Sequence, residues 1–144
     1  MVLIRNTDRL PTMFDRVFET DWRNWPEMNY SPASTTLPRV NIGENNDEYR
    51  IEVAAPGMKR DDFRINYDNG KLVISSDFNE TVDEGERYTL REFSYQSFQR
   101  TFNISREMVD GEKLKASYED GILTIILPKR DEIKPRPPRE ISIS

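Results

Sequence analysis

The stretch "LKASYEDGILTIILP" at residues 114–128 holds two β-strand patterns, one on each side of a turn. Leu114, Ala116 and Tyr118 alternate with polar residues, which is typical of a strand with one buried face. The segment "EDG" then predicts the turn. The run "ILTIILP" is apolar on both faces, as a central buried strand would be. We therefore expect antiparallel β-structure here.

Apolar residues alternate with a period of two throughout residues 38–128. Phe63, Ile65 and Tyr67 run into "DNG", a strong tight-hairpin signal because Asn and Gly accept a positive φ angle. Similar short runs occur at residues 40–42, 49–53, 72–74 and 98–104. Many short antiparallel strands joined by turns predict an all-β fold, an immunoglobulin-like antiparallel β-sandwich.

A long connection, residues 77–95, interrupts this pattern. Connections of this length inside a compact domain are uncommon and usually have a function. The connection is acidic at first, and then Tyr88 and Leu90 alternate with polar residues. This alternation predicts one more strand.

Two segments flank the predicted sandwich. In residues 1–37, apolar residues at helical spacing predict a short helix within an otherwise irregular or disordered arm. Residues 129–144 are charged and rich in proline, so we expect an extended tail. This tail ends in "REISIS", where Ile141 and Ile143 repeat the strand pattern. The arm's apolar face includes Met13, Phe14, Phe18, Trp22 and Trp25.

The composition excludes several kinds of chemistry. The 144 residues include no cysteine and no histidine, which removes disulfides, imidazole catalysis and the usual zinc ligands. A net charge of -5 disfavours binding to nucleic acid or anionic lipid. No stretch approaches the apolar length of a membrane span, and no signal-type run opens the chain. We expect a cytosolic protein without enzymatic activity, metal or cofactor.

Four segments together resemble the small heat-shock proteins: residues 53–75, residues 91–104, "LKASYEDGILTIILPK" at 114–129 and "ISI" at 141–143. The middle region is similar to their α-crystallin domain. The resemblance implies an ATP-independent chaperone, a holdase that keeps unfolding client proteins from aggregating. It also implies homodimers that assemble into larger oligomers and pass clients to ATP-dependent chaperones. Two alternatives are a monomeric co-chaperone adaptor with the same sandwich and an enzyme or sugar-binding sandwich.

The resemblance implies a docking role for the tail. Ile141 and Ile143 would fill pockets in a neighbouring subunit, between its segments 63–68 and 113–119. The alternative is a frayed chain end. The residues expected to line this groove are Ile65, Tyr67, Leu114 and Ala116.

The resemblance also implies a dimer interface. The strand with Tyr88 and Leu90 would cross to the partner subunit, and Arg100 in "FQRTF" matches the family's interface arginine. The alternatives are an edge strand or mobile loop within the chain, and an Arg100 whose guanidinium reaches water. The aromatic arm would contact clients, pack inside the oligomer, or lie on a membrane surface, which its acidic residues disfavour.

Overall fold

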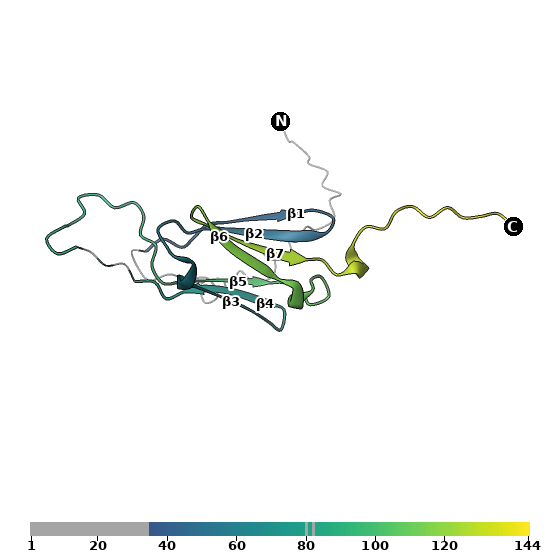
Figure 1. The fold of residues 1–144 in the computed structure, drawn as a ribbon, viewed down its shortest axis with the longest axis horizontal. Helices are drawn as coiled ribbons and strands as arrows, with labels where there is room; N and C mark the ends of the chain where they lie inside the picture. The colour runs from purple at the N-terminus through teal and green to yellow at the C-terminus, as the bar shows by residue number, and fades with distance from the viewer. Residues whose placement is uncertain (1–34, 80, 82) are drawn as a thin grey trace, which may run out of the picture.

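The computed structural model describes residues 35–79, 81 and 83–144, and these form two stacked β-sheets (Figure 1). The arm residues Met13, Phe14, Phe18, Trp22 and Trp25 lie outside the described residues. The strands are β1 (Val40–Glu44), β2 (Glu48–Ala54), β3 (Phe63–Asp68), β4 (Lys71–Ser76), β5 (Phe98–Asn103), β6 (Lys115–Glu119) and β7 (Ile122–Pro128). Three 3-10 turns accompany them, η1 (Arg60–Asp62), η2 (Gly111–Lys113) and η3 (Asp131–Ile133).

One sheet has four strands in the order β1-β2-β7-β6, and the other has three in the order β3-β4-β5. Every neighbouring pair is antiparallel. The two-sheet antiparallel sandwich predicted from the sequence is therefore confirmed. In Figure 1 the long connection between β4 and β5 and the C-terminal tail extend from opposite ends of the sandwich.

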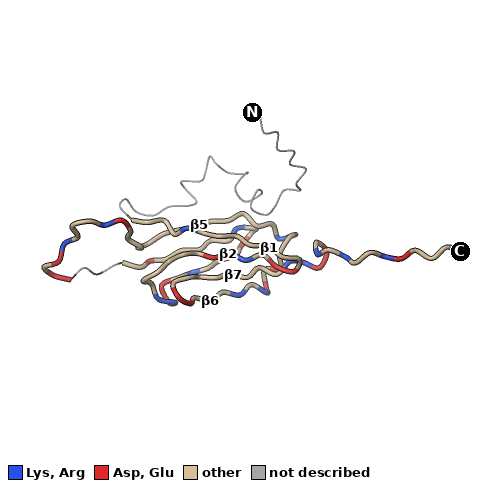
Figure 2. The backbone as a smooth tube through the Cα atoms, turned by 90° about the horizontal axis from the view of Figure 1, so that it is seen from above, with Lys and Arg blue, Asp and Glu red and all other residues tan. Residues whose placement is uncertain are grey.

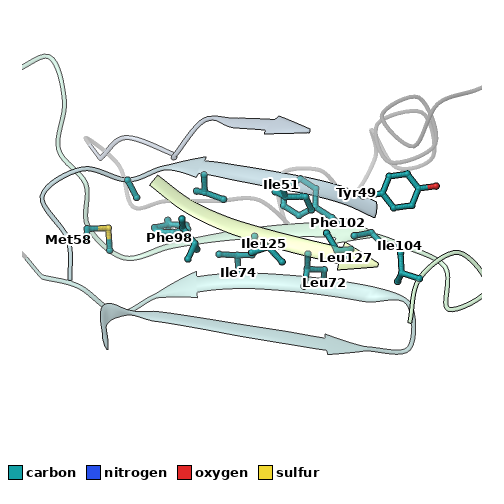
Figure 3. Close-up of a cluster of buried hydrophobic side chains, with 14 residues drawn as sticks. Tyr49, Ile51, Met58, Leu72, Ile74, Phe98, Phe102, Ile104, Ile125 and Leu127 are labelled. Atoms are coloured by element: carbon teal, nitrogen blue, oxygen red, sulfur yellow. The ribbon is translucent and has the colours of Figure 1, made fainter. Parts of the chain in front are cut away.

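The core fills the space between the two sheets (Figure 3). The central strand β7 contributes Leu123, Ile125 and Leu127, which are at most 3% exposed. Strand β5 contributes Phe98 and Phe102 from the facing sheet. The other buried apolar residues are Tyr49, Ile51, Val53, Ala55, Met58, Leu72, Ile74, Ile104 and Val109.

The second face of β7 is only partly covered, so the prediction of burial on both faces is wrong. Ile122 is 37% exposed and Ile126 is half-buried. Ile126 stands between Arg50 and Lys115 in the sheet register. The aliphatic stems of these long side chains shield an apolar neighbour without a further layer of structure.

Two hairpin turns follow the sequence signals closely. Asn69 and Gly70 have φ angles of 49° and 75°, and Asp120 and Gly121 have 50° and 79°. Two successive residues with positive φ match the twist of the strands that they join. The second turn also contacts the end of β2, because the Ala55 N–H donates to the Gly121 carbonyl over 2.9 Å.

The predicted strand around Tyr88 and Leu90 does not form in the single chain, and its pairing with a partner subunit stays a prediction. No described residue between β4 and β5 belongs to a strand. A strand needs a neighbouring edge to satisfy its backbone groups, and none of the described sheet pairings involves this connection.

The sandwich extends past residue 128, where the sequence places the start of the tail. Lys129 bridges to Val109, and its N–H donates to the Asp47 carbonyl over 2.8 Å. Its side chain is buried, with Nζ 2.7 Å from Glu44 Oε1 and 4.8 Å from the centroid of the Tyr49 ring. The root of the tail is thus fixed to the domain by a charge-assisted hydrogen bond.

Glycine 121 provides a stability test of the second hairpin. A Cβ at Gly121 would lie 3.2 Å from Pro56 Cα, in a backbone with φ of +79°. Gly121→Ala should lower the free energy of unfolding by about 1–3 kcal/mol, measured by urea denaturation. Gly57→Ala is the matched control, because Gly57 has φ of +80° and nothing within 4 Å of its Cβ position. Equal losses in both variants would show that the contact with Pro56 has no role.

Candidate functional site

Strands β3 and β6 are edge strands of opposite sheets, and side-chain contacts place them side by side. At one end the rings of Phe63 and Tyr118 have centroids 4.9 Å apart. At the other end the Tyr67 ring packs so closely that a Cβ at Gly111 would lie 2.8 Å from it. Strand β3 therefore runs antiparallel to the segment of η2 and β6, residues 111–119. The surface channel between them is here called the edge groove.

The middle and the Phe63 end of the edge groove are largely apolar. A hollow of about 220 Å³ lies there. Ile65 is half-buried and Ala116 is exposed, and both line this hollow. The lining consists of Arg60, Phe63, Ile65, Ala116, Ser117, Tyr118 and Leu123.

The Tyr67 end of the edge groove opens into a second and more polar hollow of about 540 Å³. The Tyr67 hydroxyl donates to the Ile104 carbonyl over 2.6 Å. Burial raises the pKa of Tyr67, and the nearby Arg106 and Arg130 oppose this shift. The lining comprises Tyr67, Asp68, Asn69, Arg106, Val109, Asp110, Gly111, Glu112 and Arg130.

The four predicted groove residues thus do not line one common hollow. Ile65 and Ala116 share the apolar hollow, while Tyr67 lines the polar one. Leu114 lines neither hollow, because it is half-buried against the core. Sequence reasoning missed Phe63 and Tyr118, although they continue the alternation that marks Ile65 and Ala116.

The C-terminal tail leaves the domain after η3, where Lys134 Nζ lies 3.0 Å from Asp131 Oδ1. Residues 134–144 contain no helix or strand. Figures 1 and 2 show them running away from the sandwich. Ile141 is 83% exposed and Ile143 is 98% exposed, so both side chains present their apolar surface to solvent.

Arg100 lies on β5 with its side chain on the core face, opposite Ile74 in the register. It is only 7% exposed, and burial lowers the pKa of its guanidinium. Its Cζ lies 5.7 Å from the centroid of the Phe102 ring. This burial argues against the alternative in which the guanidinium reaches water from the edge of the sheet.

The long connection carries exposed apolar side chains. Tyr88, Leu90 and Phe93 are 57%, 76% and 67% exposed. They line a hollow of about 330 Å³ that also includes Phe78 and Tyr95. Phe93 was missed from the sequence because it falls outside the Tyr88–Leu90 alternation. Exposed apolar patches of this kind mark interaction surfaces.

The connection is also tied to the sandwich by hydrogen bonds. The Ser94 N–H donates to Thr36 Oγ1 over 3.0 Å, and Arg91 Nη2 donates to Ser94 Oγ over 2.8 Å. The Arg91 guanidinium lies 4.3 Å from the centroid of the Tyr88 ring. The exposed side chains are therefore held in place near the end of the connection.

In the described part of the chain, no three histidine, cysteine or acidic side chains gather in a way that could hold a metal ion. Within the same residues, no helix has the length and hydropathy to cross a membrane.

Comparisons with known proteins identify relatives over most of the chain. The sequence profile of the Hsp20/alpha crystallin family matches residues 41–144. The 18 kDa heat shock protein of Clostridium acetobutylicum is 33% identical over 131 residues, covering 89% of this chain and 83% of its own. Heat shock protein HSP.16.4 of Streptococcus thermophilus is 33% identical over 141 residues, covering 94% of this chain and 95% of its own.

Solved structures agree with the sequence relatives. A small heat-shock protein from Xylella fastidiosa superposes with a TM-score of 0.60 at 28% identity, over 77% of this chain and 99% of its own. Heat shock protein 16.0 from Schizosaccharomyces pombe superposes with a TM-score of 0.56 at 29% identity, over 83% of each chain. The chain belongs to the Hsp20/alpha crystallin family of small heat shock proteins, which are non-enzymatic chaperones.

Proposed function

We propose that this protein is an ATP-independent holdase that works as an oligomer of dimers. The observation that carries the proposal is a complementary pair of surfaces on one chain. An exposed isoleucine pair sits on an extended tail, and a half-buried apolar groove lies between two edge strands. A chain cannot fill its own groove while its tail extends away, so a second copy is the natural occupant.

The dimer would form through the long connection. Tyr88, Leu90 and Phe93 expose apolar area, and the connection has no strand partner among the described residues of its own chain. Pairing with an edge strand of a second subunit would satisfy its backbone and bury these side chains. Arg100 would then fix the geometry of that interface, as the resemblance implies.

The energy of a single tail contact is small. Burying two isoleucines contributes about 3–6 kcal/mol before costs. Ordering a few tail residues costs about 1–2 kcal/mol each, which offsets much of this gain. One docked tail would therefore dissociate readily, while many tails in one closed assembly hold it by effective concentration. Subunit exchange would expose apolar surface that binds non-native clients.

Other parts of the proposal rest on the sequence and the family. Client contact through Met13, Phe14, Phe18, Trp22 and Trp25, transfer to ATP-dependent chaperones and a cytosolic location all remain predictions. The related protein from Xylella fastidiosa forms a distinct high order structure, which supports an assembly larger than a dimer. A monomeric adaptor is the alternative, and native mass distinguishes the two.

The holdase activity can be tested directly. An aggregation-prone enzyme is heated with and without the protein at equimolar subunits, no nucleotide is added, and light scattering is followed. Scattering should fall strongly because clients bind to exposed apolar surface. Unchanged scattering in the presence of a properly assembled protein would contradict the proposal.

The tail should control assembly size. Replacing both Ile141 and Ile143 by Ala removes the side chains that fill the groove, so native mass spectrometry should show dimers in place of larger oligomers. The free energy of unfolding should change little, because both residues are exposed. Ser142→Ala with Ser144→Ala is the control and should assemble normally. An unaltered assembly in the isoleucine variant would rule out docking.

The connection should control dimer formation. Leu90→Asp places a charge on a residue that is 76% exposed in the single chain, so it should not disturb the core. In the dimer the same charge would be buried, and monomers should appear in sedimentation velocity. Ile122→Asp, on the outer face of β7, is the control and should leave the dimer intact. If both variants remain dimeric, the dimer interface lies elsewhere.

A further inference from the structure

We propose that charge sets the direction in which the tail docks, with the tail arginines at the Tyr67 end of the edge groove. This inference rests on the proposed docking of residues 134–144 from a second copy. It adds the residues that would orient the tail. Glu112 on η2 and Arg139 on the tail are the pair that we assign to each other.

The two ends of the edge groove differ in charge. The hollow at the Tyr67 end is lined by the carboxylates of Asp68, Asp110 and Glu112. Two guanidiniums, those of Arg106 and Arg130, line the same hollow. The three negative and two positive lining groups give -1, and Lys113, which pairs with Asp110, brings the charge at this end to zero. At the Phe63 end Arg60 is the one charged lining residue, which gives +1.

The guanidiniums at the Tyr67 end are already engaged within the chain. Arg130 Nε donates to the Arg106 carbonyl, and Arg106 Nη2 donates to Asn69 Oδ1. Both also lie close enough to Tyr67 to oppose the rise in its pKa that burial causes. These contacts hold Arg106 against the turn that follows β3 and Arg130 against the segment that follows β5.

The carboxylates are less engaged. Asp110 Oδ2 lies 3.5 Å from Lys113 Nζ, and Asp110 Oδ1 accepts from the Glu112 N–H. Among the described residues, Asp68 accepts a long contact of 3.4 Å from Asn69. Among the residues that the structure describes, no ion pair or hydrogen bond to the exposed carboxylate of Glu112 is found. Glu112 is therefore available to a cation from outside.

The tail has a matching polarity. Arg136 and Arg139 precede Ile141, with two prolines between them, whereas Lys134 is paired with Asp131. If the tail enters the edge groove from the Tyr67 end, Arg139 comes to lie beside Glu112 and the isoleucines lie along the apolar hollow. Entry from the Phe63 end would bring the arginines to Arg60. Asp61 and Asp62 directly follow Arg60 in the sequence, but neither lines the hollow.

The expected size of this preference is modest. Exposed ion pairs change an equilibrium by about two- to fivefold, and salt screens them. The pair would therefore select between two directions of docking, while the isoleucines supply the affinity. The preference should weaken as ionic strength rises.

The chain contains no cysteine, so single pairs of introduced cysteines can be cross-linked without background. Ser117 is exposed and lines the hollow at the Phe63 end, so Ser117→Cys provides the fixed position in the groove. Ser142→Cys, between the isoleucines, reports docking in either direction. Ser144→Cys and Pro138→Cys report direction, and all four changes leave the charges intact. Cross-linking of the assembled protein with a flexible bismaleimide is followed on denaturing gels.

The ratio of the Ser144→Cys rate to the Pro138→Cys rate is then compared among charge variants. Glu112→Lys should lower this ratio by about two- to fivefold, and Arg139→Glu added to it should restore the ratio. Asp61→Lys at the opposite end is the matched control and should leave the ratio unchanged or raise it. Raising the salt concentration should lower the ratio in the parent protein.

The outcomes separate the two proposals. If Ser142→Cys cross-links and Glu112→Lys leaves the ratio unchanged, the tail docks but charge does not orient it. The same conclusion follows if Asp61→Lys lowers the ratio as much as Glu112→Lys does. If Ser142→Cys fails to cross-link to Ser117→Cys in the assembled protein, the proposed docking itself is wrong.

Discussion

The pairing of β7 with both β2 and β6 is the constraint on which the rest of this structure depends. It places Leu123, Ile125 and Leu127 against the opposite sheet, so one strand supplies the centre of the core. It also fixes the position of β6, because the Asp120–Gly121 turn allows only a tight return. With β6 fixed, its free edge comes to lie beside β3 of the other sheet, and the edge groove follows.

An open edge is a hazard for a soluble β-protein, since it can pair with any exposed strand. In the proposed assembly the same edge that creates this hazard would serve the function. The groove between β3 and β6 is apolar in its middle and charged at its ends, which suits a short strand of the right sequence better than a random one. The tail offers such a segment in extended form, and its root is anchored by the ion pair between the buried Lys129 and the exposed Glu44. Anchoring the root while leaving residues 134–144 extended favours contact between subunits.

Alternating apolar residues and two turn signals were enough to predict the sandwich, because both depend on local chemistry. The groove residues Ile65 and Ala116 were suggested by the resemblance to the family and not by local chemistry, and both line the apolar hollow. The exceptions depend on tertiary context. Lys129 looks like a tail residue in the sequence, and only the neighbouring Glu44 and Tyr49 make its burial favourable. The segment around Tyr88 has a strand pattern but no strand partner in its own chain, so pattern and structure differ.

The central claim is that the tail of one subunit occupies the edge groove of another. The most direct measurement adds a peptide of residues 134–144 to full-length protein carrying Ile141→Ala and Ile143→Ala, and follows the methyl NMR signals of Ile65 and Ala116. The account predicts saturable shifts at both methyl groups, little change at the buried Ile51, and no shifts with a peptide that lacks both isoleucines. Shifts confined to the long connection around Leu90, or none at all, would contradict it.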